Sequence, residues 1–475
     1  MRSTKRKNMT EFINRVAELD RLHSLYESDD FELAVVYGRR RIGKTELVLE
    51  SLRDYGDAVY HQATQTTPAI QLDRFINDAA AIYPEIEDVK QEWDPLLRHL
   101  LQTDGIVVID EFPYLVETTP ALPSEIQRIV DHDIADSSAT LVLTGSSIGM
   151  IHEHVLDGGA PLYGRLSQSP SGRVELTQLS FDAAMEFVPE YDPEEQVFTF
   201  GIFGGTPRYL RPLDGQQSIG ENVTRTLLKP DGALHDEPET VLQMELDEVN
   251  RFFALLESMA RGNRERNEIA QGAGLQSRDT SYYFDRLKTL DLIERHYPVT
   301  ADPTSTRRTR FRIRDPLFRF WFRFIYGRSG RYELYGDDAY ADLVEPELSD
   351  FVSGTFEELC RRALPTLIPE HDLRSVPGAW WYGGREIDVV APTDDGTLLV
   401  GECKFTSQPL GYDVLARLED DATHVEWTPP TGGDPDIEYA LFARNGFARS
   451  VREADDERSD LALFDLADVV SALEN

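Results

Sequence analysis

The chain has 475 residues and a formal net charge of −37, from 48 basic and 85 acidic residues, and 41% of its residues are hydrophobic. That hydrophobic content supports packed cores and excludes a disordered chain, and the length predicts about three domains. The sequence has no apolar run near the roughly 18 residues of a membrane helix, no secretory signal and only two cysteines, which predicts a cytoplasmic protein without a membrane partner.

The strong acidity can reflect adaptation to a salt-rich solvent as readily as a basic binding partner, because high salt screens the self-repulsion of a charged chain. Lysine is scarce, and the remaining basic residues are 41 arginines. The lysines are Lys5, Lys7, Lys44, Lys90, Lys229, Lys288 and Lys404. An acidic, lysine-poor and arginine-rich chain is typical of a halophilic, archaeal protein. Two of the lysines, Lys44 and Lys404, lie inside the two strongest chemical motifs.

The first motif is a phosphate-binding loop between a strand and a helix. Apolar residues 33–37 predict a buried strand, and residues 46–50 predict a helix. The loop between them matches G-x-x-x-x-G-K-T and consists of Gly38, Arg39, Arg40, Arg41, Ile42, Gly43, Lys44 and Thr45. In such a loop the backbone N–H groups wrap phosphates, Lys44 reaches the β- and γ-phosphates, and the Thr45 hydroxyl binds Mg²⁺. The sequence therefore predicts ATP and Mg²⁺ as cofactors.

Two further strands are predicted to end at the same site. The strand at residues 105–109 ends in Asp110 and Glu111. Asp110 would hold the Mg²⁺ shell, and Glu111 would polarise the attacking water. The strand at residues 139–144 ends in Gly145-Ser146-Ser147, which is either a γ-phosphate sensor or an ordinary polar turn. Strands that alternate with helices predict a doubly wound parallel sheet with its ligand at the strand carboxyl ends.

Two arginines are candidates for stabilising the charge that develops during phosphoryl transfer. Arg165 ends the run Pro-Leu-Tyr-Gly-Arg at residues 161–165, and Arg208 lies in the Gly-rich segment 204–210. We assign Arg165 a catalytic role and Arg208 a nucleotide-binding role. The alternative for each is an ordinary solvated or ion-paired arginine.

The middle of the chain predicts a winged helix. Residues 248–297 fit three helices and then a strand, with residues 280–290 as the recognition helix. The side chains expected to face DNA are Ser277, Arg278, Tyr282, Tyr283 and Arg286. Winged helices also serve as protein-binding modules, so that alternative stays open.

Residues 292–298 and 310–313 are predicted to form the wing, and a basic segment, residues 307–331, overlaps the second of these strands. It contains nine arginines, one acidic residue, Asp315, and several interleaved aromatic residues. Basic and aromatic side chains together are typical of a nucleic-acid surface. Alternatively, the aromatic residues 320–322 belong to a core and the arginines pair with carboxylates of neighbouring domains. The sequence leaves both interpretations open.

The C-terminal motif consists of two strands joined by a turn at residues 392–396. Asp388 lies on the first strand, and Glu402 and Lys404 share one face of the second. Two carboxylates can collect Mg²⁺, and a lysine can stabilise a pentavalent phosphate. Glu357 would be the upstream acid. The alternative is a vestigial site in which Lys404 only neutralises the two carboxylates.

These segments resemble known families. One group resembles the archaeal P-loop ATPase family, which is similar to AAA+ and STAND-like ATPases; it comprises residues 38–45, 109–115, 143–147, 161–165 and 204–210. That resemblance implies a nucleotide-binding core, a helical lid and often a winged helix. A second group resembles a C-terminal domain of unknown function often fused to these ATPases, which is similar to the restriction-endonuclease-like fold; it comprises residues 314–322, 354–357, 383–404 and 439–447.

The predicted fold class is therefore α/β, with a P-loop NTPase core at 9–180, a helical lid at 181–240, a winged helix at 241–315 and a restriction-endonuclease-like domain at 316–475. The leading hypothesis is an ATP-binding and ATP-hydrolysing protein that acts on or near nucleic acid, with DNA favoured over RNA, and carries an Mg-dependent nuclease site. The alternative is a nucleotide-dependent switch or DNA-binding regulator whose nuclease-like domain is not catalytic. A homo-oligomer is left open.

Overall fold

The computed structural model describes residues 12–134, 137–168, 170–246, 248–430 and 432–474. It consists of two compact units, one formed by residues 1–178 with 206–208 and the other by residues 179–205 with 209–475. The predicted domain boundaries at 180, 240 and 315 stay a prediction, and the predicted start at residue 9 lies outside the described residues. In the described part of the chain, no helix combines the length and apolar character needed to cross a membrane.

The N-terminal unit is built on a five-stranded sheet in the order β2-β3-β4-β1-β5, in which every pairing is parallel. The predicted P-loop NTPase sheet is therefore confirmed. The strands are β1 (Glu32–Tyr37), β2 (Val59–Gln62), β3 (Ile106–Asp110), β4 (Thr140–Gly145) and β5 (Arg173–Glu175). The helices are α1 (Val16–Tyr26), α2 (Lys44–Ser51), α3 (Pro68–Ala80), α4 (Trp93–Leu100), α5 (Pro113–Thr118), α6 (Leu122–His132), α7 (Ile148–Ile151) and α8 (Tyr163–Gln168).

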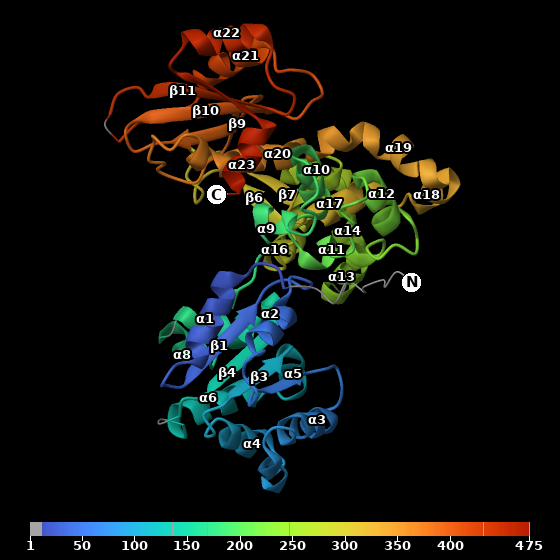
Figure 1. Cartoon of the computed structure of the whole chain (residues 1–475), viewed down its shortest axis with the longest axis vertical. Helices are drawn as coiled ribbons and strands as arrows, with labels where there is room; N and C mark the ends of the chain where they lie inside the picture. The colour runs from blue at the N-terminus through green and yellow to red at the C-terminus, as the bar shows by residue number, and fades with distance from the viewer. Residues whose placement is uncertain (1–11, 135–136, 169, 247, 431, 475) are drawn as a thin grey trace, which may run out of the picture. The chain divides into compact units, whose positions relative to one another are not determined.

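Both faces of this sheet are buried, as the continuous apolar strands predict. Leu33 and Val35 of β1 belong to one apolar cluster, whereas Ala34 and Val36 belong to another. The two sets separate because successive side chains of a strand point to opposite faces. Helices cover both faces of the sheet in Figure 1.

The second unit begins with short helices, followed by three helices and a two-stranded antiparallel sheet. The first helices are α9 (Phe181–Met185), α10 (Pro193–Phe203), α11 (Pro207–Leu210, which begins in the other unit), α12 (Ile219–Val223) and α13 (Glu237–Glu245). The next elements are α14 (Val249–Ala260), α15 (Arg266–Gly272), α16 (Ser281–Thr289), β6 (Ile293–His296) and β7 (Arg310–Ile313). The winged-helix interpretation of this segment stays a prediction.

The remainder of this unit is an α/β domain with a five-stranded sheet in the order β12-β11-β10-β9-β8. Its strands are β8 (Gly378–Tyr382), β9 (Arg385–Pro392), β10 (Thr397–Lys404), β11 (Asp436–Ala443) and β12 (Leu461–Asp465). Its helices, with those that lead into it, are α17 (Pro316–Phe320), α18 (Ser329–Tyr335), α19 (Ala339–Leu343), α20 (Glu345–Leu367), α21 (Tyr412–Ala422), α22 (Arg449–Glu457) and α23 (Leu466–Leu473). Helices α21 and α22 lie on one face of the sheet, and α20 and α23 lie on the other (Figure 1).

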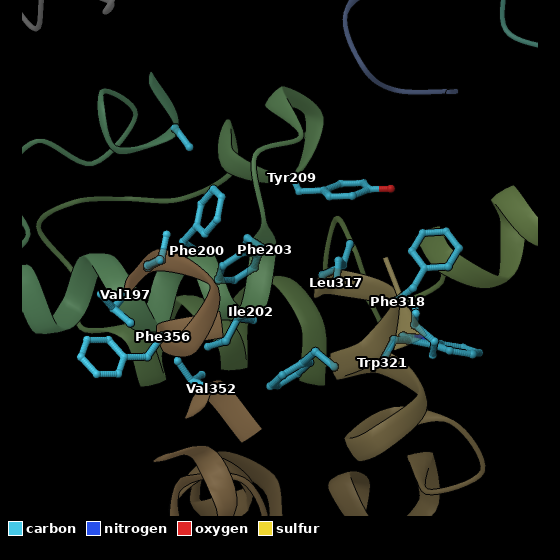
Figure 2. Packing of buried hydrophobic residues seen from close by; sticks show 14 of the residues in the cluster. Val197, Phe200, Ile202, Phe203, Tyr209, Leu317, Phe318, Trp321, Val352 and Phe356 are labelled. Atoms are coloured by element: carbon cyan, nitrogen blue, oxygen red, sulfur yellow. The ribbon is translucent and has the colours of Figure 1, made fainter. Parts of the chain in front are cut away.

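The aromatic residues of the basic segment belong to the core of this unit. Phe320, Trp321 and Phe322 are each at most 3% exposed. Figure 2 shows Trp321 beside Phe318, in the apolar cluster that also contains the packed contact between α10 and α20. That contact is close, because a Cβ on Gly201 would lie 2.8 Å from a methyl group of Val352. The structure therefore favours the core interpretation of residues 320–322 over a nucleic-acid surface.

Candidate functional site

The phosphate-binding loop connects β1 to α2, and its two glycines adopt backbone conformations that other residues rarely take. Gly38 has φ +150°, and a Cβ at this position would lie 2.3 Å from the Leu176 carbonyl oxygen. Gly43 caps α2 with φ +99°. Both positions therefore require glycine. The Ile42 side chain is buried in the apolar cluster beneath the loop and anchors it.

Lys44, the first residue of α2, is buried, and its ammonium group lies against the loop. Its Nζ donates hydrogen bonds to the carbonyl oxygens of Gly38 and Arg39, both at 2.9 Å. A lysine held in this way places its positive charge within the curve of the loop, at the N-terminus of a helix, where phosphate groups are favoured.

Asp110, at the end of β3, is fully buried and accepts hydrogen bonds from several hydroxyl groups. Its Oδ2 accepts from Thr45 Oγ1 at 2.8 Å and from the Tyr60 hydroxyl at 2.7 Å, and its Oδ1 accepts from the Thr144 hydroxyl. The structure therefore brings together Thr45 and Asp110, the two predicted Mg²⁺ ligands. Their hydroxyl and carboxylate oxygens are the hard donors that Mg²⁺ prefers.

The sequence interpretation missed Tyr60, which lies on β2. This strand is parallel to β3 and pairs Gln62 with Asp110, so Tyr60 reaches the carboxylate from the neighbouring strand. Burial, and then the Asp110 carboxylate, raise the pKa of Tyr60, so the phenol stays protonated and donates. The sequence offered only one indication of this contact, a tyrosine two residues before the end of a short strand.

Glu111 adopts a left-handed backbone conformation with φ +55°. That conformation is uncommon for a residue other than glycine and is often found at functional sites. Its carboxylate accepts hydrogen bonds from Ser146, at 3.1 Å from the backbone N–H and at 2.7 and 2.8 Å from Oγ. Ser146 thus contacts the carboxylate that is predicted to activate water. The sequence pattern at the end of β4 did not reveal this contact between Ser146 and Glu111.

The two candidate arginines lie in different surroundings. Arg165 on α8 donates to Asp131 Oδ1 at 3.0 Å and to the Val130 carbonyl at 3.1 Å, both on α6, as in the ion-paired alternative. Arg208 is exposed, and the preceding Pro207 lies next to the loop, 3.9 Å from where a Cβ on Gly43 would be. The catalytic role of Arg165 and the nucleotide-binding role of Arg208 stay predictions.

The C-terminal carboxylates lie on adjoining strands. Asp388 on β9 accepts from the Cys403 backbone N–H at 3.0 Å. Glu402 on β10 accepts from Lys404 Nζ and from Arg417, both at 2.6 Å. Burial, followed by the charges of Glu357 and Glu402, raises the pKa of Asp388 well above its ordinary value. The sequence interpretation missed Arg417, which reaches the site from α21.

These residues meet only part of the requirements of a metal site. Within the described ranges, the structure contains no group of three or more His, Cys, Asp or Glu side chains arranged to hold a metal ion. Asp388 and Glu402 offer hard oxygen donors. A cation at Glu402 would have to displace or share its contacts with Lys404 and Arg417. The observed pairing matches the alternative in which Lys404 neutralises a carboxylate.

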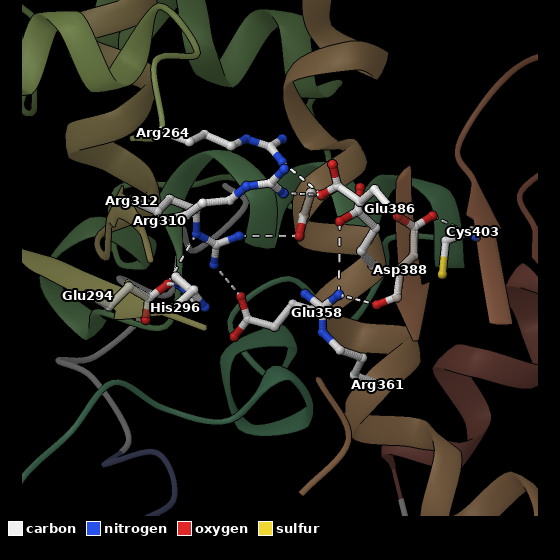
Figure 3. A network of polar contacts seen from close by, with 12 residues as sticks. Arg264, Glu294, His296, Arg310, Arg312, Glu358, Arg361, Glu386, Asp388 and Cys403 are labelled. Atoms are coloured by element: carbon white, nitrogen blue, oxygen red, sulfur yellow. Dashed lines mark hydrogen bonds and ion pairs between the residues drawn. The ribbon is translucent and has the colours of Figure 1, made fainter. Parts of the chain in front are cut away.

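One prediction about nucleic-acid contacts requires correction, and the ion pairs decide between the two interpretations that the sequence left open for several arginines of the basic segment. Tyr283, expected to face DNA, is only 7% exposed, because its ring packs in the core and its hydroxyl accepts a hydrogen bond from Arg251. Within the described residues, four of the nine arginines of the basic segment form ion pairs with carboxylates, as Figure 3 shows for Arg310 and Arg312. Arg310 contacts Glu386 at 2.6 Å, and Arg312 contacts Glu294 at 3.1 Å and Glu358 at 2.5 Å. Arg314 pairs with Asp291 and Arg323 with Glu347.

Glu358→Gln is expected to destabilise the second unit by about 2 kcal/mol at neutral pH, because it removes a partner of the partly buried Arg312. Burial would raise the pKa of Glu358, but Arg312 and Arg362 lower it to about 2. An acid whose pKa is lower in the folded state stabilises the protein above its unfolded pKa, about 4.3. The difference between wild type and variant should therefore be complete above that pH and shrink as the pH falls toward 2.

Guanidinium unfolding at several pH values, followed by tryptophan fluorescence, measures this difference, since four of the five tryptophans lie in the second unit. Glu453→Gln is the matched control, because its pair with Arg449 is exposed on both sides. A Glu358→Gln effect equal to that of the control, or one that does not change between pH 5 and pH 2, would contradict the argument.

Comparison with known proteins agrees with these observations. Residues 12–213 match a family described as an ATPase domain predominantly from Archaea, and residues 321–418 match a family of archaeal and bacterial proteins of unknown function. The uncharacterized protein MJECL04 of Methanocaldococcus jannaschii is 30% identical over 390 residues, which cover 81% of this chain and 85% of that protein.

Solved structures with similar folds include the Walker-type ATPase of Pyrococcus abyssi, at 18% identity and a TM-score of 0.47, over 66% of this chain and 96% of that one. Another is Cdc6p from Pyrobaculum aerophilum, at 14% identity and a TM-score of 0.32, over 66% of this chain and 93% of that one. The assignment to a family rests on the sequence comparisons and not on these solved structures. It agrees with the geometry of the phosphate-binding loop, Lys44 and Asp110. The chain belongs to the archaeal P-loop ATPase family and carries at its C-terminus a domain of the second family, whose function is unknown.

Proposed function

We propose that the N-terminal unit binds ATP with Mg²⁺ and hydrolyses it at the edge of the sheet formed by β1, β3 and β4. The observation that carries this proposal is the buried Asp110 carboxylate, hydrogen-bonded to Thr45 directly beside the phosphate-binding loop. Thr45 and Asp110 would hold Mg²⁺, which when bound neutralises charge on the β- and γ-phosphates. Lys44 would add a second positive charge within the loop.

Glu111 is the proposed general base. Its carboxylate follows Asp110 directly in sequence, and the Ser146 contacts hold it at the carboxyl edge of the sheet. From this position Glu111 would accept a proton from the attacking water, whereas Ser146 is a positioning residue that acts through Glu111. The left-handed backbone at Glu111 turns its side chain out of the strand direction and supports this division of roles.

We further propose that ATP turnover is coupled to nucleic acid, with DNA favoured. The observation in support is the exposed surface at the start of α16, where the Tyr282 ring is 66% exposed and the Arg278 side chain is 79% exposed. An exposed aromatic ring next to an exposed arginine suits stacking and phosphate contacts. In the rival proposal, a regulatory switch, the winged helix binds a protein through the same exposed surface, so this surface by itself does not distinguish the two proposals.

A second candidate function is divalent-metal phosphodiester cleavage at Asp388 and Glu402, with Lys404 and Glu357 assisting. The observation that favours it is the mutual repulsion of these carboxylates, which together with burial raises the pKa of Asp388. A bound cation would relieve that repulsion. The pairing of Glu402 with Lys404 and Arg417 instead favours a module that does not cleave.

One experiment tests both proposals. The full chain, in high salt with Mg²⁺ or Mn²⁺, is mixed with ATP and a panel of single- and double-stranded DNA and RNA, and both phosphate release and strand cleavage are measured. ATP hydrolysis stimulated by DNA supports the first proposal, and cleavage that disappears in Asp388→Ala supports the second. An ATPase rate that no nucleic acid changes, together with intact substrates, would favour the switch without nuclease activity.

A further inference from the structure

A cavity of about 280 Å³ in the second unit is lined by an excess of positive charge. It lies between α14, α17, α20, β7 and β8, and seven arginines and three carboxylates contribute to its wall. The excess is unexpected in a chain whose net charge is −37. Four of these arginines come from the basic segment and two, Arg261 and Arg264, from the turn before α15. Figure 3 shows Arg264, Arg310 and Arg312 converging on this region from one side.

Three of the seven arginines, Arg261, Arg312 and Arg323, pair with carboxylates outside the wall, whereas the other four are only partly neutralised. Arg264 and Arg310 share a single carboxylate, that of Glu386, at 3.2 and 2.6 Å. Arg361 donates to the Asp388 carbonyl oxygen at 2.6 Å and lies 3.9 Å from Glu357.

Arg319 is the arginine with the least compensation. Its terminal nitrogen donates to the Thr355 hydroxyl at 2.7 Å, and its guanidinium lies over the Phe351 ring at 5.1 Å. Within the part of the chain that the structure describes, no carboxylate lies within ion-pair distance of Arg319, and its buried Nε has no hydrogen-bond partner. Burial and the neighbouring Arg312 lower the pKa of Arg319 to about 9. An anion in the cavity would satisfy both the charge and the open donor.

We propose that this cavity binds a phosphate monoester, either the terminal phosphate of a nucleic-acid strand or that of a free nucleotide. Arginine matches phosphate because its planar fork presents several N–H donors to two oxygens at once. The rings of Trp381 and Phe351 hold the guanidinium planes of Arg310 and Arg319 in place, at 4.4 and 5.1 Å. This site depends neither on ATP hydrolysis nor on cleavage.

The size of the cavity restricts its ligand. Its volume of about 280 Å³ is just below the roughly 300–1,000 Å³ typical of small-molecule pockets. A phosphoryl group with its attached sugar is the expected occupant, whereas a nucleic-acid duplex is far too large. Glu357 contributes to the wall, so a strand held by its terminal phosphate would begin beside the Asp388 cluster.

Binding is tested with the full chain carrying Lys44→Ala, so that the phosphate-binding loop does not compete for the probe. The probes are a short single-stranded DNA labelled at its 3′ end with a 5′-phosphate, the same strand with a 5′-hydroxyl, and deoxyadenosine monophosphate. Fluorescence anisotropy and calorimetry at moderate salt measure the dissociation constants. The 5′-phosphate is expected to strengthen DNA binding about tenfold or more, and Arg319→Gln should remove that gain.

Arg314→Gln is the matched control, since Arg314 belongs to the same segment and pairs with Asp291 away from the cavity. Arg264→Gln is a second test variant, because its side chain is 56% exposed and its loss should leave the fold intact. Tighter binding of phosphorylated DNA than of the mononucleotide identifies a strand end, and equal affinities identify a free nucleotide. Phosphorylated and unphosphorylated probes that bind alike, or affinities that neither Arg319→Gln nor Arg264→Gln changes, would overturn the proposal.

Discussion

Glu111→Gln is expected to slow ATP turnover by about 100-fold or more while ATP binding is retained. The amide keeps the shape of the side chain and can still bond to Ser146, but it cannot accept a proton from water. Asp110, Thr45 and Lys44, which would bind the nucleotide and its metal ion, are unchanged by this substitution. The measurement is single-turnover ATP hydrolysis beside equilibrium binding of ATP at the same salt concentration.

Glu117→Gln provides a matched control, because Glu117 is an exposed carboxylate on α5, a few residues after Glu111. Its turnover should equal that of the wild type. Equal turnover in Glu111→Gln and wild type would remove Glu111 from the role of general base and would require another group to activate the water. A loss of ATP binding in Glu111→Gln would instead indicate that Glu111 supports the nucleotide site itself.

Lys44→Ala is expected to weaken ATP binding by about 10- to 100-fold, the range for losing charge-assisted hydrogen bonds. The ammonium group is buried and points into the loop, where the Gly38 and Arg39 carbonyls hold it. Its removal takes a full positive charge away from the N-terminus of α2, whose own partial charge is much weaker. Titration with a fluorescent ATP analogue measures the change in dissociation constant.

Lys90→Ala is the control for this substitution. Lys90 belongs to the same unit, but its side chain is 69% exposed and pairs only with the exposed Glu92. Circular dichroism of both variants establishes that the fold is retained. ATP affinity that is the same in Lys44→Ala, Lys90→Ala and wild type would contradict a phosphate-binding role for the Lys44 ammonium group.

The nucleotide site was largely predictable because its parts are local in sequence. A buried strand, a glycine-rich turn and a helix start follow one another within residues 33–50, and their geometry depends mainly on adjacent residues. Parallel strands then bring their carboxyl ends to one edge, which places Thr45 beside Asp110. Tyr60 escaped prediction, since its contact depends on the order of strands in the sheet, and many orders are compatible with the same strand pattern.

The basic segment shows the opposite case. Alternating arginines and aromatic residues fit a nucleic-acid surface and a packed core equally well, because side-chain type alone does not specify a partner. The partner of Arg310 is Glu386, and that of Arg312 is Glu358, both many residues away in the chain. Only the packing of α20 and the C-terminal sheet against β7 decides these pairs. Among the described residues, the same packing gives Arg319 no carboxylate partner.

The sequence by itself therefore determined the phosphate-binding loop, the carboxylates at the strand ends and the presence of a second α/β domain, since each depends on short-range patterns of apolar residues, glycines and charges. The tertiary structure alone decided which charges neutralise one another. Glu402 with Arg417, Glu111 with Ser146 and the uncompensated Arg319 arise from contacts between distant elements. Burial decides the strength of such contacts, because a charge inside the protein is costly unless a partner or ligand compensates it.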